Sequence, residues 1–402
     1  MVAMRILFYA ALPLIFAIPA SAQTEADVSP ADRAAHERMI VLDTHLDIPI
    51  RWEDENWDFG VRHHYEFDRS QVDLPRMEEG GLDGGFLVIY IGQGDLTPQG
   101  YAQARDAALL RAAAIHRVLG ENEDRIALAR TADDAERLHA AGRRFAFISM
   151  ENSWPLGEDL SLLTTFQRLG VRMAGPVHSR TNQFADSTTG EARWNGLSPL
   201  GRQWVAEMNR LGLVIDGSHS SDAAFDQMLE LSRVPIILSH SGSRSIFGHP
   251  RNIDDARLVR LARAGGVMFV NSVFLVQNDN SPEREAINQR HENWANLTPD
   301  QQRQLLLDTA ALDAQRPYTT ADFELYMRSL LHAVRVMGVD HVGLGADWDG
   351  GGGVIGMADV GALPRITARL RREGMSDADI AKIMGGNLLR ILRQAERHAA
   401  SR

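Results

Sequence analysis

Histidines and carboxylates that could bind divalent metal ions recur along this chain just after short apolar segments. The first two, His45 and Asp47, form a His-x-Asp motif. Residues two apart on a strand point to the same side, so both side chains can face one ion. Imidazole and carboxylate ligands suit zinc, manganese, cobalt or iron, and zinc is the usual choice for hydrolysis. The further candidates are Glu151, His178, His219, His240 and Asp347.

The positions of these residues argue that they act together. A single histidine near an apolar segment is more often a hydrogen-bonded structural residue than a ligand. Here, however, every candidate follows a predicted strand, and barrel enzymes build their sites where the carboxyl ends of the strands meet. Two ions about 3.5 to 4 Å apart need a carboxylate that bridges them, and Glu151 is our candidate. A carbamylated lysine is the alternative bridge, but the single lysine, Lys382, lies in the last predicted helix.

The elements that must position these residues alternate between strands and helices. Eight short apolar segments, separated by amphipathic stretches with helical spacing, predict an α/β fold that is a single (β/α)8 TIM barrel. The predicted strands are 39–42, 85–91, 144–150, 171–176, 212–216, 235–238, 266–270 and 341–345. The clearest predicted helices are 103–119, 200–211, 222–231, 254–264 and 323–337.

Two stretches exceed a minimal barrel. Residues 51–73 are polar and aromatic, include His63 and His64, and are predicted to form a loop over the barrel mouth. Residues 277–320 are charged and glutamine-rich and are predicted to be a helical insertion after strand seven. Stretches of this length are usually functional lids or partner surfaces, and a disordered insertion is the alternative.

The amino terminus predicts export. Residues 1–22 combine Arg5, an apolar run and the sequence Ala20-Ser21-Ala22, which together are typical of a cleaved signal peptide. We expect a mature chain of residues 23–402, one domain, in the periplasm or secreted. The apolar run is shorter than the roughly 20 residues that span a bilayer, although an uncleaved anchor is the alternative. The polar carboxyl terminus offers no lipid-anchor signal, so no stable membrane anchor is expected in the mature protein.

Composition narrows the function classes. The 402 residues are 44% hydrophobic, enough for a sizeable core, and carry a net charge of -11 with no basic patch, which argues against a nucleic-acid partner. Cysteine is absent, which excludes disulfides, thiol nucleophiles and thiolate metal sites.

Several motifs together resemble the membrane dipeptidase, or renal dipeptidase, family of metallopeptidases. The resemblance covers nearly the whole mature chain. One departure is Asn152-Ser153-Trp154 after Glu151, where family members often have small residues; it bears on pocket shape rather than on the bridge. The motifs are Asp43–Asp47, Met150-Glu151, Val177–Asn182, Asp216–His219, Leu238–Ser241, Arg251–Asp255 and Asp340–Gly350.

The resemblance implies a metal set and a reaction. It implies that His45 and Asp47 bind one ion, that His219 and His240 bind the other, and that Glu151 bridges them. The expected reaction is hydrolysis of small dipeptides, including those with a D-residue at the carboxyl-terminal position, by a metal-bridging hydroxide. The resemblance also suggests a homodimer.

Three further roles come from the same resemblance. His178 is expected to stabilise the developing oxyanion, and Arg251 to bind the substrate carboxylate, a task that suits its planar guanidinium. Asp347 is expected to be the acid/base carboxylate, with Asp349 as the less favoured candidate. Two alternative functions stay open: an amidohydrolase that acts on a lactam or N-acyl amino acid, and a non-catalytic exported binding protein.

Overall fold

Parallel strands form the centre of the molecule. The computed structural model describes residues 28–292 and 297–401. One sheet has the strand order β1-β2-β4-β5-β6, with β3 paired to β4, and the other has the order β7-β8-β9. The strands are β1 Leu42–Leu46, β2 Gly84–Tyr90, β3 Ile126–Leu128, β4 Arg144–Glu151, β5 Val171–Ala174, β6 Val214–Ile215, β7 Ile237–Ser241, β8 Val267–Val270 and β9 Val342–Leu344.

Single bridges join the two sheets at both edges. A parallel bridge between Asp216 and Ile237 connects the end of β6 to β7, and another between Leu46 and Trp348 connects β1 to the chain that follows β9. The two sheets therefore make a ring of parallel strands, as the (β/α)8 prediction requires. β3 pairs only with the start of β4 and lies outside this ring.

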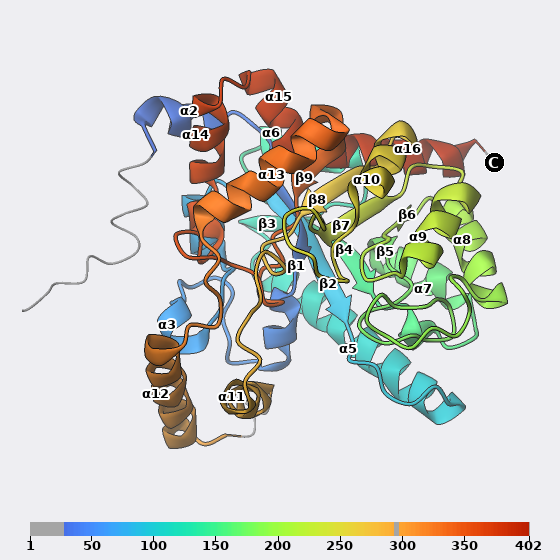
Figure 1. Ribbon diagram of the computed structural model, residues 1–402, viewed down its shortest axis with the longest axis horizontal. Helices are drawn as coiled ribbons and strands as arrows, with labels where there is room; N and C mark the ends of the chain where they lie inside the picture. Colours follow the sequence, from blue (N-terminus) through green and yellow to red (C-terminus); the bar gives the residue numbers. More distant parts are fainter. Residues whose placement is uncertain (1–27, 293–296, 402) are drawn as a thin grey trace, which may run out of the picture.

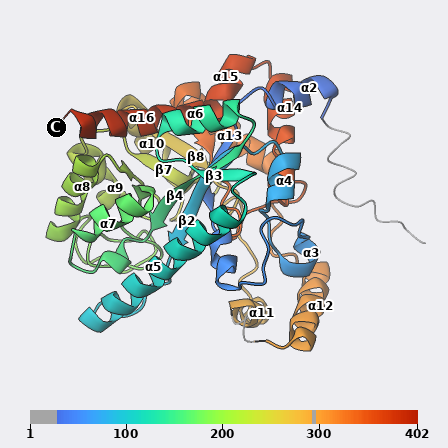
Figure 2. The ribbon, with the colours of Figure 1, turned by 180° about the vertical axis from the view of Figure 1, so that it is seen from behind.

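Helices cover the outside of the ring (Figure 1). Seen from behind, α5 and α6 pack against β2, β3 and β4 (Figure 2). Many helices begin at a side-chain cap: Ser198 accepts from the N–H of Gly201 where α8 starts, and Pro199 follows as its first residue. The helices outside the ring are α2 Pro30–His36, α4 Leu74–Glu79, α5 Pro98–Glu121, α6 Ala132–Ala140, α7 Leu162–Leu169, α8 Pro199–Leu211, α9 Asp222–Leu231, α10 Asp255–Arg263, α13 Phe323–Met337, α14 Pro364–Arg372, α15 Asp377–Ala381 and α16 Asn387–Ala400.

The strands place apolar side chains at one end of the ring and polar ones at the other. On β4, Phe145, Phe147 and Glu151 share one face because side chains alternate along a strand. The phenylalanines belong to a buried apolar cluster that also includes Leu388 and Leu392 of α16. Glu151, at the last position of β4, lies at the carboxyl end of the strand, where the ring is polar.

Most predicted elements are confirmed, but the first strand was placed too early. The prediction was 39–42, whereas β1 is Leu42–Leu46. Its polar residues are compatible with a buried strand because neighbouring strands satisfy them: Asp43 accepts from the N–H of Ala346 at 3.0 Å, and Thr44 donates to the carbonyl of Ser239 at 2.5 Å. β3 was missed, since three residues give too short a pattern.

The two long stretches are largely ordered. Residues 51–73 include the second half of a 3-10 helix, η1 Ile48–Glu53, and the short helix α3 Tyr65–Asp68, so they are not only loop. The stretch 277–320 contains α11 Pro282–Glu292 and α12 Pro299–Gln315, which lie between β8 and α13 in the chain. Both helices lie on the side of the molecule opposite α16 (Figure 1).

The predicted signal peptide, residues 1–22, lies outside the described residues. None of the helices in the described part of the chain combines the length and the apolar character that crossing a membrane requires.

Candidate metal centre

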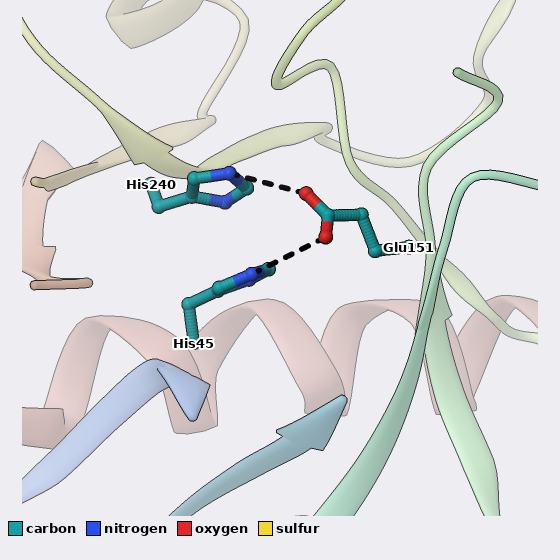
Figure 3. A group of neighbouring side chains, drawn as sticks. All are labelled: His45, Glu151 and His240. Carbon is teal, nitrogen blue, oxygen red and sulfur yellow. Dashed lines mark ion pairs between the residues drawn. The ribbon is translucent and has the colours of Figure 1, made fainter. Parts of the chain in front are cut away.

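Glu151 stands at the centre of the predicted ligands and faces histidines with both of its oxygens. Its Oε2 lies 3.6 Å from Nε2 of His45, and its Oε1 lies 3.1 Å from Nε2 of His219 and 3.3 Å from Nε2 of His240. Figure 3 shows His45 and His240 converging on the two oxygens from different strands. The Glu151 side chain is only 7% exposed. One buried carboxylate is thus shared between two sets of imidazoles.

A second group of ligand atoms surrounds His45. Its Nε2 lies 3.2 Å from Oδ2 of Asp47 and 4.0 Å from Oδ1 of Asp347. Burial alone would lower the pKa of His45, but the carboxylates of Asp47 and Glu151 outweigh it and hold this pKa well above its ordinary value. The electrostatic potential at this imidazole is therefore negative, which favours the binding of a cation.

The chemistry of these donors fits divalent cations. Nε2 of His219 and Nε2 of His240 lie 2.9 Å apart, and burial lowers the pKa of both imidazoles well below the ordinary value. Neutral imidazoles are the form that binds metal. Oε1 of Glu151 and Nδ1 of His45 are buried without a hydrogen-bond partner among the described residues. The groups able to hold an ion are His45–Glu151–His240, Glu151–His178–His219 and His45–Asp47–Asp347, each with its ligand atoms within 4.8 Å of one another.

Buried carboxylates behind these histidines support the centre, and sequence reasoning missed their role. Asp216 accepts from the hydroxyl of Ser239 at 2.5 Å, and that hydroxyl lies 2.8 Å from Nδ1 of His240. Asp43 accepts from the N–H groups of His45 and Ala346. The Ser239 hydroxyl thus links Asp216 to the His240 ring, a partner of the kind that orients a ligating imidazole, whereas Asp43 holds the backbone of His45. The available signal was that Asp43 and Asp216 precede histidines by two and three residues.

The backbone turns sharply around the centre. Four non-glycine residues in or beside it have positive φ: Asn152 at 64°, His219 at 64°, Asp347 at 70° and Asp349 at 64°. Such left-handed conformations cost energy for these residues, and they concentrate at sites where side-chain placement matters more than local stability. Each follows a strand end, where the chain must turn to aim a side chain inward.

Gly350 is required for the close approach of two carboxylates. A Cβ atom there would overlap both Oδ2 of Asp47 and Oδ1 of Asp347. We expect Gly350→Ala to lower kcat/KM about 100-fold for the dipeptide substrates that the sequence resemblance implies, since a misplacement of about 1 Å at a reacting site has that cost. Steady-state kinetics on the purified variant measure it. Gly248→Ala is the matched control, because nothing lies within 4 Å of its added Cβ, and a change beyond about twofold would contradict the steric explanation.

Arg251 brings a buried positive charge to the same pocket. Its guanidinium donates to the hydroxyl of Ser241 at 3.0 Å and to the carbonyl of His240 at 2.8 Å, and it lies 5.7 Å from the ring centre of Phe274. Its Nε is buried without a hydrogen-bond partner among the described residues. Burial lowers the pKa of Arg251 to about 10, so the side chain stays charged at neutral pH. The residue is poised to bind an anion.

His178 lies at the open side of the centre. Its Nε2 is 3.9 Å from Oε1 of Glu151, and its Nδ1 is 2.6 Å from the Ser179 hydroxyl and 3.4 Å from the Tyr90 hydroxyl. Burial lowers its pKa. Tyr90 was not among the predicted residues, because a tyrosine at a strand end carries no distinctive spacing.

A cavity of about 500 Å³ joins these groups. It is lined by predicted and unpredicted residues, and the predicted ones include Asp47, Glu151, His178, Arg251, Asp347 and Asp349. His63 lies apart from this lining: it stacks on Trp57 at 4.1 Å and pairs with Asp68 at 2.8 Å. The structure therefore brings the predicted ligands and Arg251 together and leaves His63 in a separate contact.

Comparisons with known proteins bear on this arrangement. Residues 31–402 match the family model described as membrane dipeptidase, peptidase family M19. Dipeptidase tcpJ of Claviceps purpurea is 30% identical over 363 residues, covering 86% of this chain and 77% of that protein. The probable dipeptidase PvdM from Pseudomonas aeruginosa superposes with a TM-score of 0.78 and 28% identity, covering 92% of this chain and 98% of that one. A metallo peptidase from Rhodobacter sphaeroides, solved with a phosphinate mimic of the dipeptide L-Ala-D-Ala, gives a TM-score of 0.71 and 26% identity over 89% and 99% of the two chains.

Proposed function

This chain belongs to the membrane dipeptidase family, peptidase family M19, and is a metallo-dipeptidase, and from that premise we propose that it holds two divalent ions about Glu151. The observation that carries the proposal is the position of the Glu151 carboxylate, whose two oxygens face different histidines. Zinc suits a ligand set that consists of imidazoles and carboxylates and serves hydrolysis.

The ligands divide into two sets in this proposal. His45 and Asp47 hold one ion, His219 and His240 hold the other, and Glu151 belongs to both. When bound, two such ions would polarise the substrate carbonyl and make a water molecule acidic enough to attack at neutral pH. Asp216, through the Ser239 hydroxyl, keeps the His240 imidazole oriented, and Asp43 fixes the backbone of His45.

Asp347 is proposed to move the proton. Burial raises its pKa to about 7, with further contributions from the nearby carboxylates of Asp47 and Glu151. A carboxyl group with this pKa can accept a proton and return it to the leaving amine near neutral pH. His178, with Nε2 facing the pocket, is proposed to stabilise the negative charge that develops on the carbonyl oxygen.

The proposed substrates are dipeptides, including those with a D-residue at the carboxyl-terminal position. Support comes from the Rhodobacter sphaeroides relative, whose bound ligand mimics L-Ala-D-Ala. It also comes from Arg251, a buried guanidinium that can bind a free carboxylate in the same pocket as Glu151. The same family membership favours dipeptides over lactams or N-acyl amino acids, and over a non-catalytic role.

The test removes the Arg251 guanidinium. We expect Arg251→Ala to lower kcat/KM for L-Ala-D-Ala by about 30-fold or more, because loss of one partner of a buried charge pair costs about 2 to 5 kcal/mol. L-Ala-D-alaninamide, which lacks the carboxylate, is the matched substrate, and its already low kcat/KM should change less than about threefold. Equal losses for both substrates would remove the carboxylate-binding role.

Three further expectations from the sequence stay proposals. They are a single barrel domain over residues 23–402, export after removal of residues 1–22, and assembly as a homodimer. Mass spectrometry of the secreted chain tests the second, and the molar mass in solution tests the third.

A further inference from the structure

One side of the substrate pocket is built by residues that no part of the metal centre uses. Val276, Asn278 and Asn280, which follow β8, and Tyr318, which follows α12, line the cavity together with Glu151 and Arg251. We call these four residues the outer wall. They come from the chain on either side of α11 and α12, which lie beyond the carboxyl ends of the strands (Figure 1).

A buried ion-pair network fixes the outer wall. Arg284 of α11 is 1% exposed, and its guanidinium lies 3.2 Å from Oδ2 of Asp279 and 2.7 Å from Oδ1 of Asp313. It also donates to the carbonyl of Arg316 at 2.8 Å. The N–H of Asp279 donates to the carbonyl of Tyr318 at 2.9 Å, which joins the two chain segments of the outer wall directly. A fully buried guanidinium is costly unless its geometry is well satisfied, so this network specifies one arrangement of the wall.

The wall faces the pocket with a bulky ring and an unused acceptor. The Tyr318 ring lies 5.8 Å from the guanidinium carbon of Arg284. Oδ1 of Asn278 is buried and has no hydrogen-bond partner within the described ranges. The Asn278 side chain also forms a hydrogen bond with Tyr318, so it helps to hold the ring against the pocket.

The position of the outer wall relative to Arg251 assigns it to one end of the substrate. Arg251 contacts His240, Ser241 and Phe274, on the β7 and β8 side of the pocket. Arg69, which follows β1 and α3 in the chain, pairs with Asp313 of α12 at 3.8 Å, so the part of the outer wall at Tyr318 lies on the side where the chain follows β1. With a carboxylate at Arg251, the carboxyl-terminal residue occupies the space up to the metal ligands. The space bounded by Tyr318 is left for the amino-terminal residue.

We propose that Tyr318 determines which amino-terminal residues the enzyme accepts, and that Arg284 is a positioning residue that holds Tyr318 in place. The ring of Tyr318 limits the size of the amino-terminal side chain. This inference rests on the proposed binding of the substrate carboxylate by Arg251.

Selectivity of the holoenzyme towards two peptide series tests the proposal. In the first series the amino-terminal residue varies (Gly-Ala, Ala-Ala, Trp-Ala), and in the second the carboxyl-terminal residue varies (Ala-Gly, Ala-Ala, Ala-Trp). We expect Tyr318→Ala to raise the kcat/KM ratio of Trp-Ala to Ala-Ala about tenfold, within the range that pocket size controls. The ratio of Ala-Trp to Ala-Ala should stay within about twofold. Tyr318→Phe, which keeps the ring, should retain the wild-type ratios.

Further variants separate positioning from stability. Arg284→Met should shift the Trp-Ala ratio in the same direction as Tyr318→Ala, whereas a purely structural role would lower all rates together. Leu307→Ala is the control: Leu307 lies on α12 and is 59% exposed, so its replacement should keep the wild-type ratios. An unchanged ratio in Tyr318→Ala, or equal shifts in both series, would overturn the proposal. Failure of the wild-type enzyme to distinguish peptides from their amides would instead overturn the role of Arg251.

Discussion

Replacement of Glu151 by glutamine is expected to abolish dipeptide hydrolysis and metal binding together. The amide keeps the size of the side chain but loses the negative charge. Its NH2 group would place N–H donors where a carboxylate oxygen of the wild-type chain faces His219 and His240. We expect kcat/KM to fall at least about 1,000-fold, which is about 4 kcal/mol of transition-state stabilisation. Elemental analysis of the variant, after dialysis against limiting zinc, should find less metal than in the wild-type chain.

The control for this prediction is the same change at an exposed position nearby. Glu158 lies seven residues further along the chain and is exposed, so Glu158→Gln should change kcat/KM by less than about twofold. A Glu151→Gln protein that keeps its full metal content and its activity would contradict the shared-carboxylate geometry on which the proposed function depends.

The convergence of the proposed ligands on one end of the ring was predictable because it depends on two simple regularities. Strands carry their polar ends to one face of a barrel, and histidines and carboxylates follow those ends at Glu151, His219 and His240. An error of three residues in the position of the first strand did not matter, because His45 and Asp47 stay at the same end of the ring.

Other parts of the site could not be predicted from the sequence because their partners are distant in the chain. Asp43 finds the N–H of Ala346 across 303 residues, and Asn278 is placed by contacts between the two ends of the α11–α12 stretch. Only the closed ring brings such residues together. The first strand was predicted at 39–42 and not at 42–46 for the same reason: the groups that satisfy Thr44 in a buried strand come from β7 and β9.

The arrangement also explains why the centre tolerates a strained backbone. Positive φ at His219 and Asp347 aims both side chains inward directly after a strand or turn. The surrounding contacts over-determine these conformations: Asp216 holds the N–H of Ser218, beside His219, and Asp347 accepts through its carbonyl from the N–H of Gly352. The backbone is thus less stable locally at His219 and Asp347, and in return their side chains point into the site.

Replacement of Asp347 by asparagine should separate proton transfer from metal binding. Asparagine has nearly the same shape but cannot take up a proton, so we expect kcat to fall about 100- to 10,000-fold while KM changes little. Oδ1 of Asp347 lies 4.0 Å and Oδ2 of Asp47 lies 3.2 Å from Nε2 of His45, so the position of Asp347 allows both an acid/base role and a ligand role. Metal content measured beside the kinetics distinguishes the two, because an acid/base residue can be lost without loss of metal.

Asp349→Asn provides the comparison, because Asp349 lines the same pocket but its carboxylate is already engaged. It accepts from the N–H of Gln71 and from Nε of Arg51, each at 3.2 Å. Its oxygens are therefore already hydrogen-bonded within the protein and are less available to exchange a proton with substrate. We expect its kcat to fall no more than about tenfold. A larger loss in Asp349→Asn than in Asp347→Asn would move the proton-transfer role to Asp349, and a loss of metal in Asp347→Asn would make Asp347 a ligand.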